Sequence, residues 1–336
     1  MIQRRAFLKA GVAGAVSAVA MPWVRRANAA TSLTFFTPFG FSPDYIEVMN
    51  AKSAGYFADE GLDVTVRGAQ GTAQVMQQLI TGEAHIIRSA QLDQMRLVQN
   101  QNLPLTCIST LYQASNFYLI SSKERPINEA KDLKGKTIGV VSVGGTTSIY
   151  LDFMMIKGGY SKDDVRRETT GNGPGAFQLV KQGRIDGFIA THAAFIPLER
   201  AGEPITYFSS DKYAPMPNQG FLTTRGFLEK NPDAAVAFLR AIKRSVDDIL
   251  TKPHQQIFER AAKDFEIQGI RNMDNVLAIS QNWPRLLLAQ GKENLLRNVP
   301  ELWKQGVDVL ASVNFLKPTD PTAFYTNDYI DKALKA

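Results

Sequence analysis

The chain has 336 residues but only one cysteine, Cys107, and only three histidines, His85, His192 and His254. A single cysteine excludes a disulfide framework, and Cys107 lies in the apolar stretch LPLTCIST, so we expect an inert core thiol. The patterns H-E-x-x-H, C-x-x-C and G-x-S-x-G do not occur. We therefore predict no metal site, no cofactor and no catalytic residue.

The sequence also lacks a hydrophobic run long enough to cross a membrane, which needs roughly 20 residues. Its longest apolar stretch, residues 10–21, follows QRRAFLK and precedes ANAA, the three-part layout of a cleaved secretory signal over residues 1–29. The pair Arg4-Arg5 indicates the twin-arginine route, although Gln3 stands where Ser or Thr is usual. The residue directly after the cleavage site is not cysteine, so we expect a periplasmic protein without a lipid anchor.

Residues 30–336 lack an excess of charge of one sign. The whole sequence carries 38 basic and 32 acidic residues, and residues 1–29 hold five of the basic ones and none of the acidic ones. Residues 30–336 therefore have one net positive charge, which gives no electrostatic basis for binding nucleic acid.

What the sequence does contain is one order of predicted elements, strand-helix-strand-helix-strand, that occurs twice. Strands predicted at residues 32–37, 62–67 and 84–89 alternate with helices at 43–57 and 72–82. From residue 136 the same order recurs, with strands at 136–142, 164–169 and 184–190 and helices at 146–160 and 175–183. Strands separated by helices predict an α/β fold with two lobes, each a mostly parallel sheet flanked by helices.

The chain is predicted to cross between the lobes twice. A strand at residues 116–121 leaves lobe one, and the stretch PNQGFLTT returns to it before a long helix with Asn231 as N-cap and Pro232 in its first turn. In that helix Val236, Leu239, Ile242, Val246 and Ile249 recur at helical spacing and are predicted core residues. The rest of the chain is predicted to be helical. The division is residues 30–120 plus 218–336 for lobe one and 121–217 for lobe two.

Ligands of open α/β sheets bind outside the carboxyl ends of the strands. The six loops at these ends are residues 37–42, 68–71 and 89–91 in lobe one and 144–148, 171–175 and 191–192 in lobe two, and they offer hydroxyls, amides and few charges. We expect them to face one another across a single cleft that admits a small polar or aromatic solute. Two crossings would let the lobes close on that solute.

Several cleft candidates have an alternative structural role. Phe39 and Phe41 could stack on a ring or simply pack within their loop. Arg88 could bind a carboxylate or sulfonate, or instead face solvent or form an ion pair between the lobes. Asp44 could accept from an amine or only offset a helix dipole. His192 is a weak candidate base because the sequence shows no orienting partner for it.

The loop VGGTTS at residues 143–148 precedes a helix and could present N–H groups to an anion. It lacks the lysine of the G-x-x-x-x-G-K-[ST] pattern, and it does not match G-x-G-x-x-G. We interpret it as one side of a solute-binding cleft and not as a nucleotide site.

Five blocks resemble, in order, the periplasmic solute-binding proteins of ABC importers for nitrate, sulfonates, taurine and thiamin-pyrimidine precursors (the SsuA/NMT1-like family). They are AKSAGYFADEGLDV, GTAQVMQQLITGEAHI, DLKGKTIGVVSVGGTTS, LVKQGRIDGF and KNPDAAVAFLRA. The resemblance implies the type II periplasmic binding protein fold with a helical C-terminal region. It implies ligand contacts near residues 39–45, 89–91 and 146–148. The candidate ligand-binding residues are Phe39, Phe41, Asp44, Tyr45, Gln70, Arg88, Ser89, Gln91, Tyr112, Asn116, Gly145, Thr146, Thr147, Ser148, Asn172 and His192.

The resemblance predicts a monomer that captures a small organic solute, such as a sulfonate, a carboxylate or a pyrimidine, and delivers it to a membrane permease and its ATPase. Two alternatives remain. One is an exported enzyme, because a pyrimidine synthase of thiamin biosynthesis shares this fold, although the cysteine-rich motif of that enzyme is absent here. The other is a binding protein that serves a signalling receptor.

Overall fold

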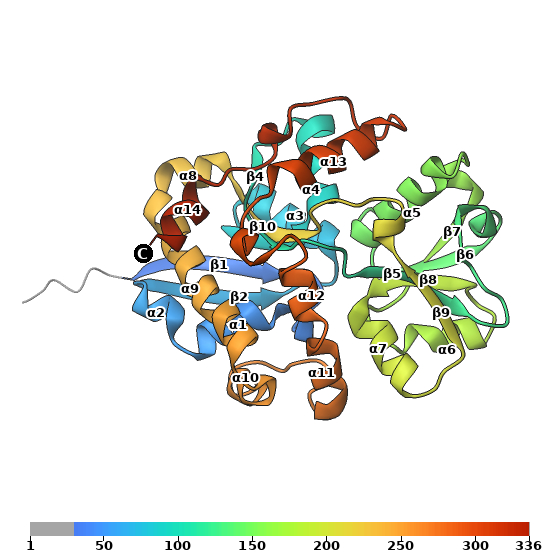
Figure 1. The fold of residues 1–336 in the computed structure, drawn as a ribbon, viewed down its shortest axis with the longest axis horizontal. Coiled ribbons are helices and arrows are strands. Elements are labelled where there is room, and N and C mark those ends of the chain that lie inside the picture. Colours follow the sequence, from blue (N-terminus) through green and yellow to red (C-terminus); the bar gives the residue numbers. More distant parts are fainter. Residues whose placement is uncertain (1–29, 336) are drawn as a thin grey trace, which may run out of the picture.

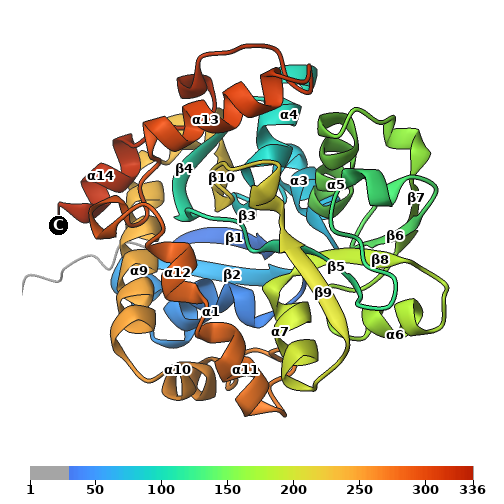
Figure 2. The ribbon, with the colours of Figure 1, turned by 45° about the vertical axis from the view of Figure 1, so that its right-hand side comes forward.

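The computed structural model describes residues 30–335, which form two lobes side by side (Figures 1 and 2). The signal predicted in residues 1–29 lies outside the described residues. Each lobe is built on one five-stranded sheet. The structure thus confirms the predicted two-lobed α/β fold.

Lobe one is defined by the sheet β2-β1-β3-β10-β4. Its strands are β1 (Thr31–Thr37), β2 (Leu62–Gly68), β3 (Ile86–Ala90), β4 (Leu105–Tyr112) and β10 (Gln219–Thr224). β1 pairs in parallel with β2 and β3, whereas β10 runs antiparallel between β3 and β4. The returning strand therefore fills the gap between two strands of the first half of the chain.

Lobe two is defined by the sheet β7-β6-β8-β5-β9. Its strands are β5 (Phe117–Ser122), β6 (Thr137–Val140), β7 (Arg166–Thr169), β8 (Gly187–Thr191) and β9 (Ile205–Ser209). β5 is the antiparallel strand and lies between β8 and β9. Because β5 pairs in this sheet from Phe117 onward, the first crossing occupies residues 113–116, a few residues before the predicted change at residue 121.

Helices cover both sheets, and the helices that follow β10 cover lobe one (Figure 1). Lobe one holds α1 (Ile46–Ser53), α2 (Tyr56–Asp59), α3 (Thr72–Thr81) and α4 (Gln91–Gln101), and lobe two holds α5 (Thr146–Lys157), α6 (Ala176–Lys181) and α7 (His192–Arg200). The later helices are α8 (Arg225–Lys230), α9 (Pro232–Thr251), α10 (His254–Ala261), α11 (Met273–Ser280), α12 (Trp283–Leu287), α13 (Pro300–Ala311) and α14 (Asp328–Leu334). Short 3-10 turns are η1 (Pro43–Tyr45), η2 (Ala130–Leu133), η3 (Lys162–Asp164), η4 (Ser210–Lys212), η5 (Lys292–Asn294) and η6 (Pro321–Ala323).

One local prediction was wrong. The single helix expected over residues 43–57 is divided into η1, α1 and α2, because Gly55 adopts a left-handed backbone with φ of 78° that ends the first helix. Asn231 is the N-cap residue of α9, as predicted, although its side chain donates to the Phe227 carbonyl and makes no capping hydrogen bond. Pro232 does occupy the first turn of α9.

The core of lobe one is aromatic. The ring of Phe238 on α9 stacks on Phe35 of β1 and on Phe57 of α2, with ring centroids 5.7 and 5.3 Å apart, and meets Phe221 of β10 edge-on. All five apolar residues predicted for the core face of α9 are buried. This packing fixes the first sheet against the C-terminal helices and so positions the ends of its strands.

The two crossings, residues 113–116 and 210–218, are joined to each other. The Ser115 amide donates to the Asp211 carboxylate at 3.0 Å, and the Ser115 and Ser210 hydroxyls lie 2.7 Å apart. Asn218 donates to the Ser115 hydroxyl and also to the Tyr150 hydroxyl of α5. The connection between the lobes is therefore a hydrogen-bonded pair of segments and not two independent linkers.

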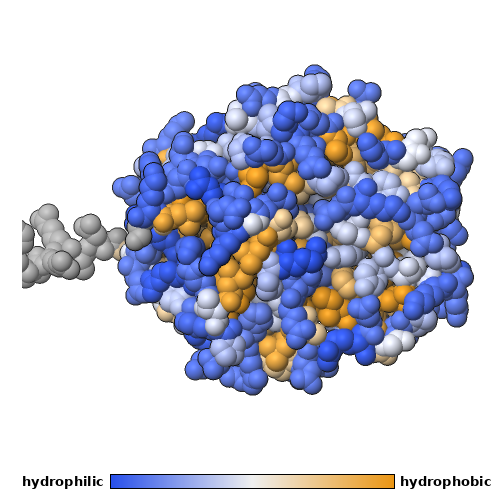
Figure 3. All heavy atoms as spheres, viewed as in Figure 1, coloured by the Kyte–Doolittle hydropathy of each residue, from blue (hydrophilic) through white to orange (hydrophobic). Residues whose placement is uncertain are grey.

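Among residues 30–335, the helices are all too short or too polar to cross a membrane. Within the same range, His, Cys, Asp and Glu side chains do not gather in groups of three or more that could hold a metal. The face in Figure 3 is mostly hydrophilic, with separate apolar areas between polar ones.

Candidate functional site

One contact between the lobes joins Asp44 and His192, which are both fully buried. Asp44 lies in η1 after β1, and His192 opens α7 after β8, so both follow the carboxyl end of a strand, as predicted. His192 Nε2 is 2.8 Å from Asp44 Oδ1, although the pair does not meet hydrogen-bond geometry in this conformation. Burial alone would raise the pKa of the Asp44 carboxyl, but His192 and Arg88 hold that pKa below its ordinary value.

The sequence shows no orienting partner for His192, whereas the structure places Asp44 beside it. The partner could not be found from sequence spacing, because Asp44 and His192 belong to different lobes and meet only when the strand ends face each other. The pairing places a carboxylate and an imidazole side by side at the junction of the lobes.

Arg88 of β3 forms the second feature of the site. Its Nη1 donates to Glu47 Oε1 at 2.6 Å and to the Asp44 carbonyl at 2.7 Å, and both Arg88 and Glu47 are buried. Burial raises the pKa of Glu47 and the Arg88 guanidinium opposes that rise. Both structural alternatives considered for Arg88 are wrong, because it does not face solvent and its ion pair lies within lobe one.

Two tyrosines enclose the Arg88 guanidinium. Its Cζ lies 4.4 Å from the ring centre of Tyr112 and 5.1 Å from that of Tyr45. The Tyr112 hydroxyl is 3.4 Å from the Asp44 carbonyl, and burial raises the pKa of both phenols. Both rings are therefore neutral hydrogen-bonding groups across the accessible pH range.

Around this cluster, buried polar atoms lie without a protein partner. Buried polar groups in folded proteins are nearly always paired, so a concentration of unpaired ones indicates a place where a ligand or water supplies the partner. These atoms come from both lobes and from the returning strand. They are Arg88 Nε and Nη2, Ser89 Oγ, Gln91 Oε1, Asn116 Oδ1, His192 Nδ1 and Gln219 Oε1.

The glycine loop after β6 makes a different contact. Thr146, the first residue of α5, donates its hydroxyl to Asp93 of α4, and it lies 2.8 Å from the Thr72 hydroxyl of α3. Burial raises the pKa of Asp93 to about 7, and the hydrogen bond from Thr146 and the charge of Arg96 oppose that rise. The polar group held at this helix start is thus a carboxyl of lobe one.

The neighbours of Thr146 have roles within lobe two. Gly145 is the buried N-cap of α5, and a Cβ there would lie 2.3 Å from the Ser142 hydroxyl. Thr147 accepts from the Val141 amide at 2.9 Å, so it closes its own loop. Ser148 is buried in the first turn of α5.

The remaining predicted residues divide between the junction and the periphery. Phe39 is buried, and its ring meets Phe117 of lobe two edge-on at 6.4 Å. Phe41 packs on Phe265 of lobe one at 5.1 Å, which is the packing role considered for it. Gln70 is exposed. Asn172 forms two hydrogen bonds with Thr191, so it braces the loop before His192.

Sequence reasoning missed Glu47 and Gln219. Glu47 lies three residues after Asp44, a spacing that places two side chains on one helical face, so the pattern DYIE carried a signal. Gln219 begins β10, and an antiparallel strand brings its amino end to the carboxyl ends of its neighbours, here Ala90 and Tyr112. The expectation of few charges at the strand ends was wrong, since Asp44, Glu47, Arg88 and His192 gather there.

Cys107 is buried on β4, as expected of a core thiol. Gln91 donates to its sulfur at 3.3 Å, and burial raises the pKa of the thiol to about 12. At neutral pH the sulfur is therefore a thiol and not a nucleophilic thiolate.

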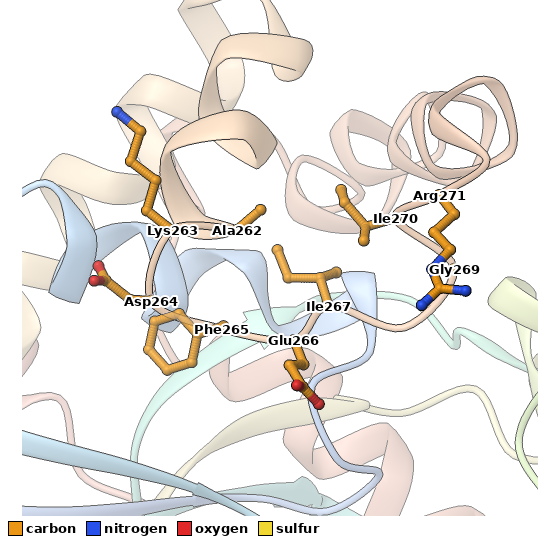
Figure 4. A pocket seen from close by; sticks show the side chains of 9 residues that line it. All are labelled: Ala262, Lys263, Asp264, Phe265, Glu266, Ile267, Gly269, Ile270 and Arg271. Carbon is orange, nitrogen blue, oxygen red and sulfur yellow. The ribbon is translucent and has the colours of Figure 1, made fainter.

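The structure has one hollow beside the contact between the lobes and a second, wider one away from it. A cavity of about 150 Å³ opens beside the Asp44–His192 contact, between Ser42, Asn172 and Ala193 and the α11 residues Asn275 and Ile279. A wider hollow of about 600 Å³ lies along the loop of residues 262–271 of lobe one (Figure 4). In Figure 4 the charged side chains around it point in different directions, so the wider hollow has no convergent polar set.

Known proteins share this architecture or resemble this chain in sequence. The alkanesulfonate-binding protein SsuA from Xanthomonas axonopodis pv. citri, solved with MOPS, superposes with a TM-score of 0.65 at 12% identity, over 88% of this chain and 99% of its own. The riboflavin-binding protein RibY of Chloroflexus aurantiacus is 23% identical over 89% of this chain and 85% of its own length. The 4-amino-5-hydroxymethyl-2-methylpyrimidine phosphate synthase of Schizosaccharomyces pombe is 27% identical over 66% of this chain and 67% of its own length.

The fold and the junction of strand ends define a protein with the two-lobed architecture of periplasmic binding proteins. The sequence model of the NMT1/THI5-like family matches residues 42–256, and the chain belongs to that family. Its relatives include both named binding proteins and named synthases.

Proposed function

We propose that this protein is an extracytoplasmic solute-binding protein that holds a small organic solute between its lobes and delivers it to an ABC importer. The observation that carries the proposal is the set of unpaired polar atoms buried where the lobes meet, from Arg88 and Ser89 on one side to Asn116 and His192 on the other. A solute that pairs with both sides would favour the closed arrangement over the open one.

The predicted leader and the periplasmic binding proteins that share this fold support export to the periplasm. The twin-arginine route is proposed from Arg4-Arg5 alone. The monomeric state is proposed from the family resemblance. The ligand-binding side chains in this proposal are those at the junction, above all Asp44, Arg88, Ser89, Asn116 and His192. The relatives that bind riboflavin and make a phosphorylated pyrimidine favour a ring compound as the solute.

The proposal is tested by purifying the mature chain and measuring what it carries. Native mass spectrometry should show one solute molecule per chain, and the solute should be released unchanged on unfolding. A protein that carries no solute and binds neither riboflavin, 4-amino-5-hydroxymethyl-2-methylpyrimidine, MOPS nor nitrate in calorimetry would contradict the proposal.

A second candidate is an exported enzyme, because Asp44 and His192 place a carboxylate next to an imidazole at the junction. Conversion of a bound solute by the wild type, with loss of conversion but not of binding in His192→Ala, would favour it. Stoichiometric binding with no change in solute mass favours the binding protein.

A further inference from the structure

The buried ion pair between Arg88 and Glu47 bears on which solutes the cleft can accept. Both side chains are almost wholly excluded from solvent, with exposures of 0% and 3%, and their charged atoms are 2.6 Å apart. A buried charge needs a partner of opposite sign, and here each already has one within its own lobe.

The summed charge at the junction is not positive. Among the buried side chains of residues 30–335, the only basic ones are Arg88 and His192. They face the carboxylates of Glu47 and Asp44. The four groups sum to zero if His192 is protonated and to one negative charge if it is not. An anion entering beside these four groups would therefore meet no uncompensated buried cation and would lie near Asp44.

The part of Arg88 that remains available is an edge of the guanidinium. Nη1 is used by Glu47 and by the Asp44 carbonyl, and the rings of Tyr45 and Tyr112 lie beside the guanidinium. Nε and Nη2 remain without a protein partner. These two donors can bind a carbonyl oxygen or a ring nitrogen while Glu47 keeps the charge of Arg88 compensated.

We propose that Glu47 is a specificity-determining residue: by compensating Arg88 in a buried pair, it makes the cleft select uncharged ring solutes over anions such as nitrate or a sulfonate. The inference rests on the proposed function. It adds the charge class of the solute and names the residue that sets it.

The test is the variant Glu47→Gln, which keeps the shape of the side chain, removes the ion-pair partner of Arg88 and raises the summed charge of the four groups by one. Calorimetry with MOPS and with nitrate should show at least about tenfold tighter binding than in the wild type, because the buried guanidinium then gains a partner. This gain is measured on the anions alone, so it does not depend on which ring compound the wild type binds.

The matched control is Glu168→Gln, which removes the acid of an exposed Glu–Arg pair, 2.8 Å from Arg184 on lobe two, and changes the net charge equally. It should leave anion binding unchanged. The double variant Glu47→Gln/Arg88→Gln removes both charges and should lose the gain. A Glu47→Gln protein that binds the anions no better than Glu168→Gln overturns the proposal.

If Glu47→Gln does not fold, anion binding by the wild-type protein tests the proposal instead. Saturable binding of MOPS or nitrate by the wild type overturns the proposal, and its absence supports it. Failure of the proposed function would look different, since a protein that converts its solute would fail as a binding protein even if Glu47 still excluded anions.

Discussion

Asp93 shows at the scale of one residue how the stability of the folded protein depends on pH. Its carboxyl is buried between α3, α4 and α5, with the Thr72 and Thr146 hydroxyls beside it and Arg96 and Tyr150 as the charged or titratable neighbours. Burial raises its pKa from 3.8 to about 7. The folded protein therefore binds a proton that the unfolded chain releases between about pH 4 and pH 7.

This difference has a definite sign. A carboxyl with a raised pKa in the folded state contributes less stability as the pH rises from about 4 to about 7, and the loss is complete above that range. The shift corresponds to at most about 4 kcal/mol. In Asp93→Asn, which keeps an oxygen to accept from Thr146, the free energy of unfolding should fall less between pH 5 and pH 8 than in the wild type. Urea titrations at several pH values measure this.

The control for that experiment is Asp63→Asn, a change at an exposed surface carboxylate whose side chain is 62% accessible. It should follow the wild-type pH dependence. Parallel curves for Asp93→Asn and the wild type would contradict the prediction, because they would mean that Asp93 is ionised in the folded protein throughout pH 5 to pH 8.

At the scale of elements, two neighbouring threonines at the start of α5 have different roles, which the sequence could not distinguish. Thr146 contacts lobe one and Thr147 closes its own loop. The pattern GGTTS correctly predicted a helix start at the cleft, since glycine and hydroxyl residues before an apolar helical stretch are typical of one. It could not show that Thr146 contacts Asp93 of the other lobe while Thr147 closes its own loop, because those partners are distant in sequence.

Thr146→Ala should weaken solute binding about tenfold with little change in melting temperature. The hydrogen bond it removes joins the lobes. Above about pH 7, where Asp93 is ionised, a hydrogen bond to a carboxylate contributes roughly 1.5 kcal/mol or more to the closed arrangement. Calorimetry and thermal unfolding measure the two quantities. Unchanged affinity in Thr146→Ala would mean that this contact does not help to close the lobes.

Thr147→Ala is the neighbouring control, and it should lower the melting temperature without weakening solute binding. It leaves the buried Val141 amide without an acceptor, which costs about 1–3 kcal/mol of folding stability and does not act across the cleft. Its melting temperature should fall while its affinity stays near that of the wild type.

At the scale of the whole molecule, the order of strands and helices predicted the two lobes because hydrophobic periodicity and turn residues are local signals. β9 and α7 were not predicted: β9 is a short, half-buried strand, and Pro197 within α7 is unusual in a helix. The pairs Asp44–His192 and Glu47–Arg88 depend on tertiary contacts across many residues. The fold was therefore largely predictable, whereas the charge of the site was not.

Closure of the two lobes has a measurable signature along the chain. On binding of a solute, hydrogen–deuterium exchange should slow at the first turns of α5 and α7 and in α11, which packs on α7 across the cleft. Exchange in α9 and α14, which pack on each other in lobe one, should stay unchanged. Uniform slowing over both groups would indicate general stabilisation without closure.

The position of β10 also governs the order in which the protein can form during synthesis. β3 and β4 do not pair with each other, and the strand that joins them lies at residues 219–224, after all of lobe two. Lobe two, a continuous segment, can complete its sheet while β3 and β4 still present open edges on the nascent chain. A released chain that is truncated before residue 219 should therefore contain a protease-resistant lobe two beside a protease-sensitive lobe one.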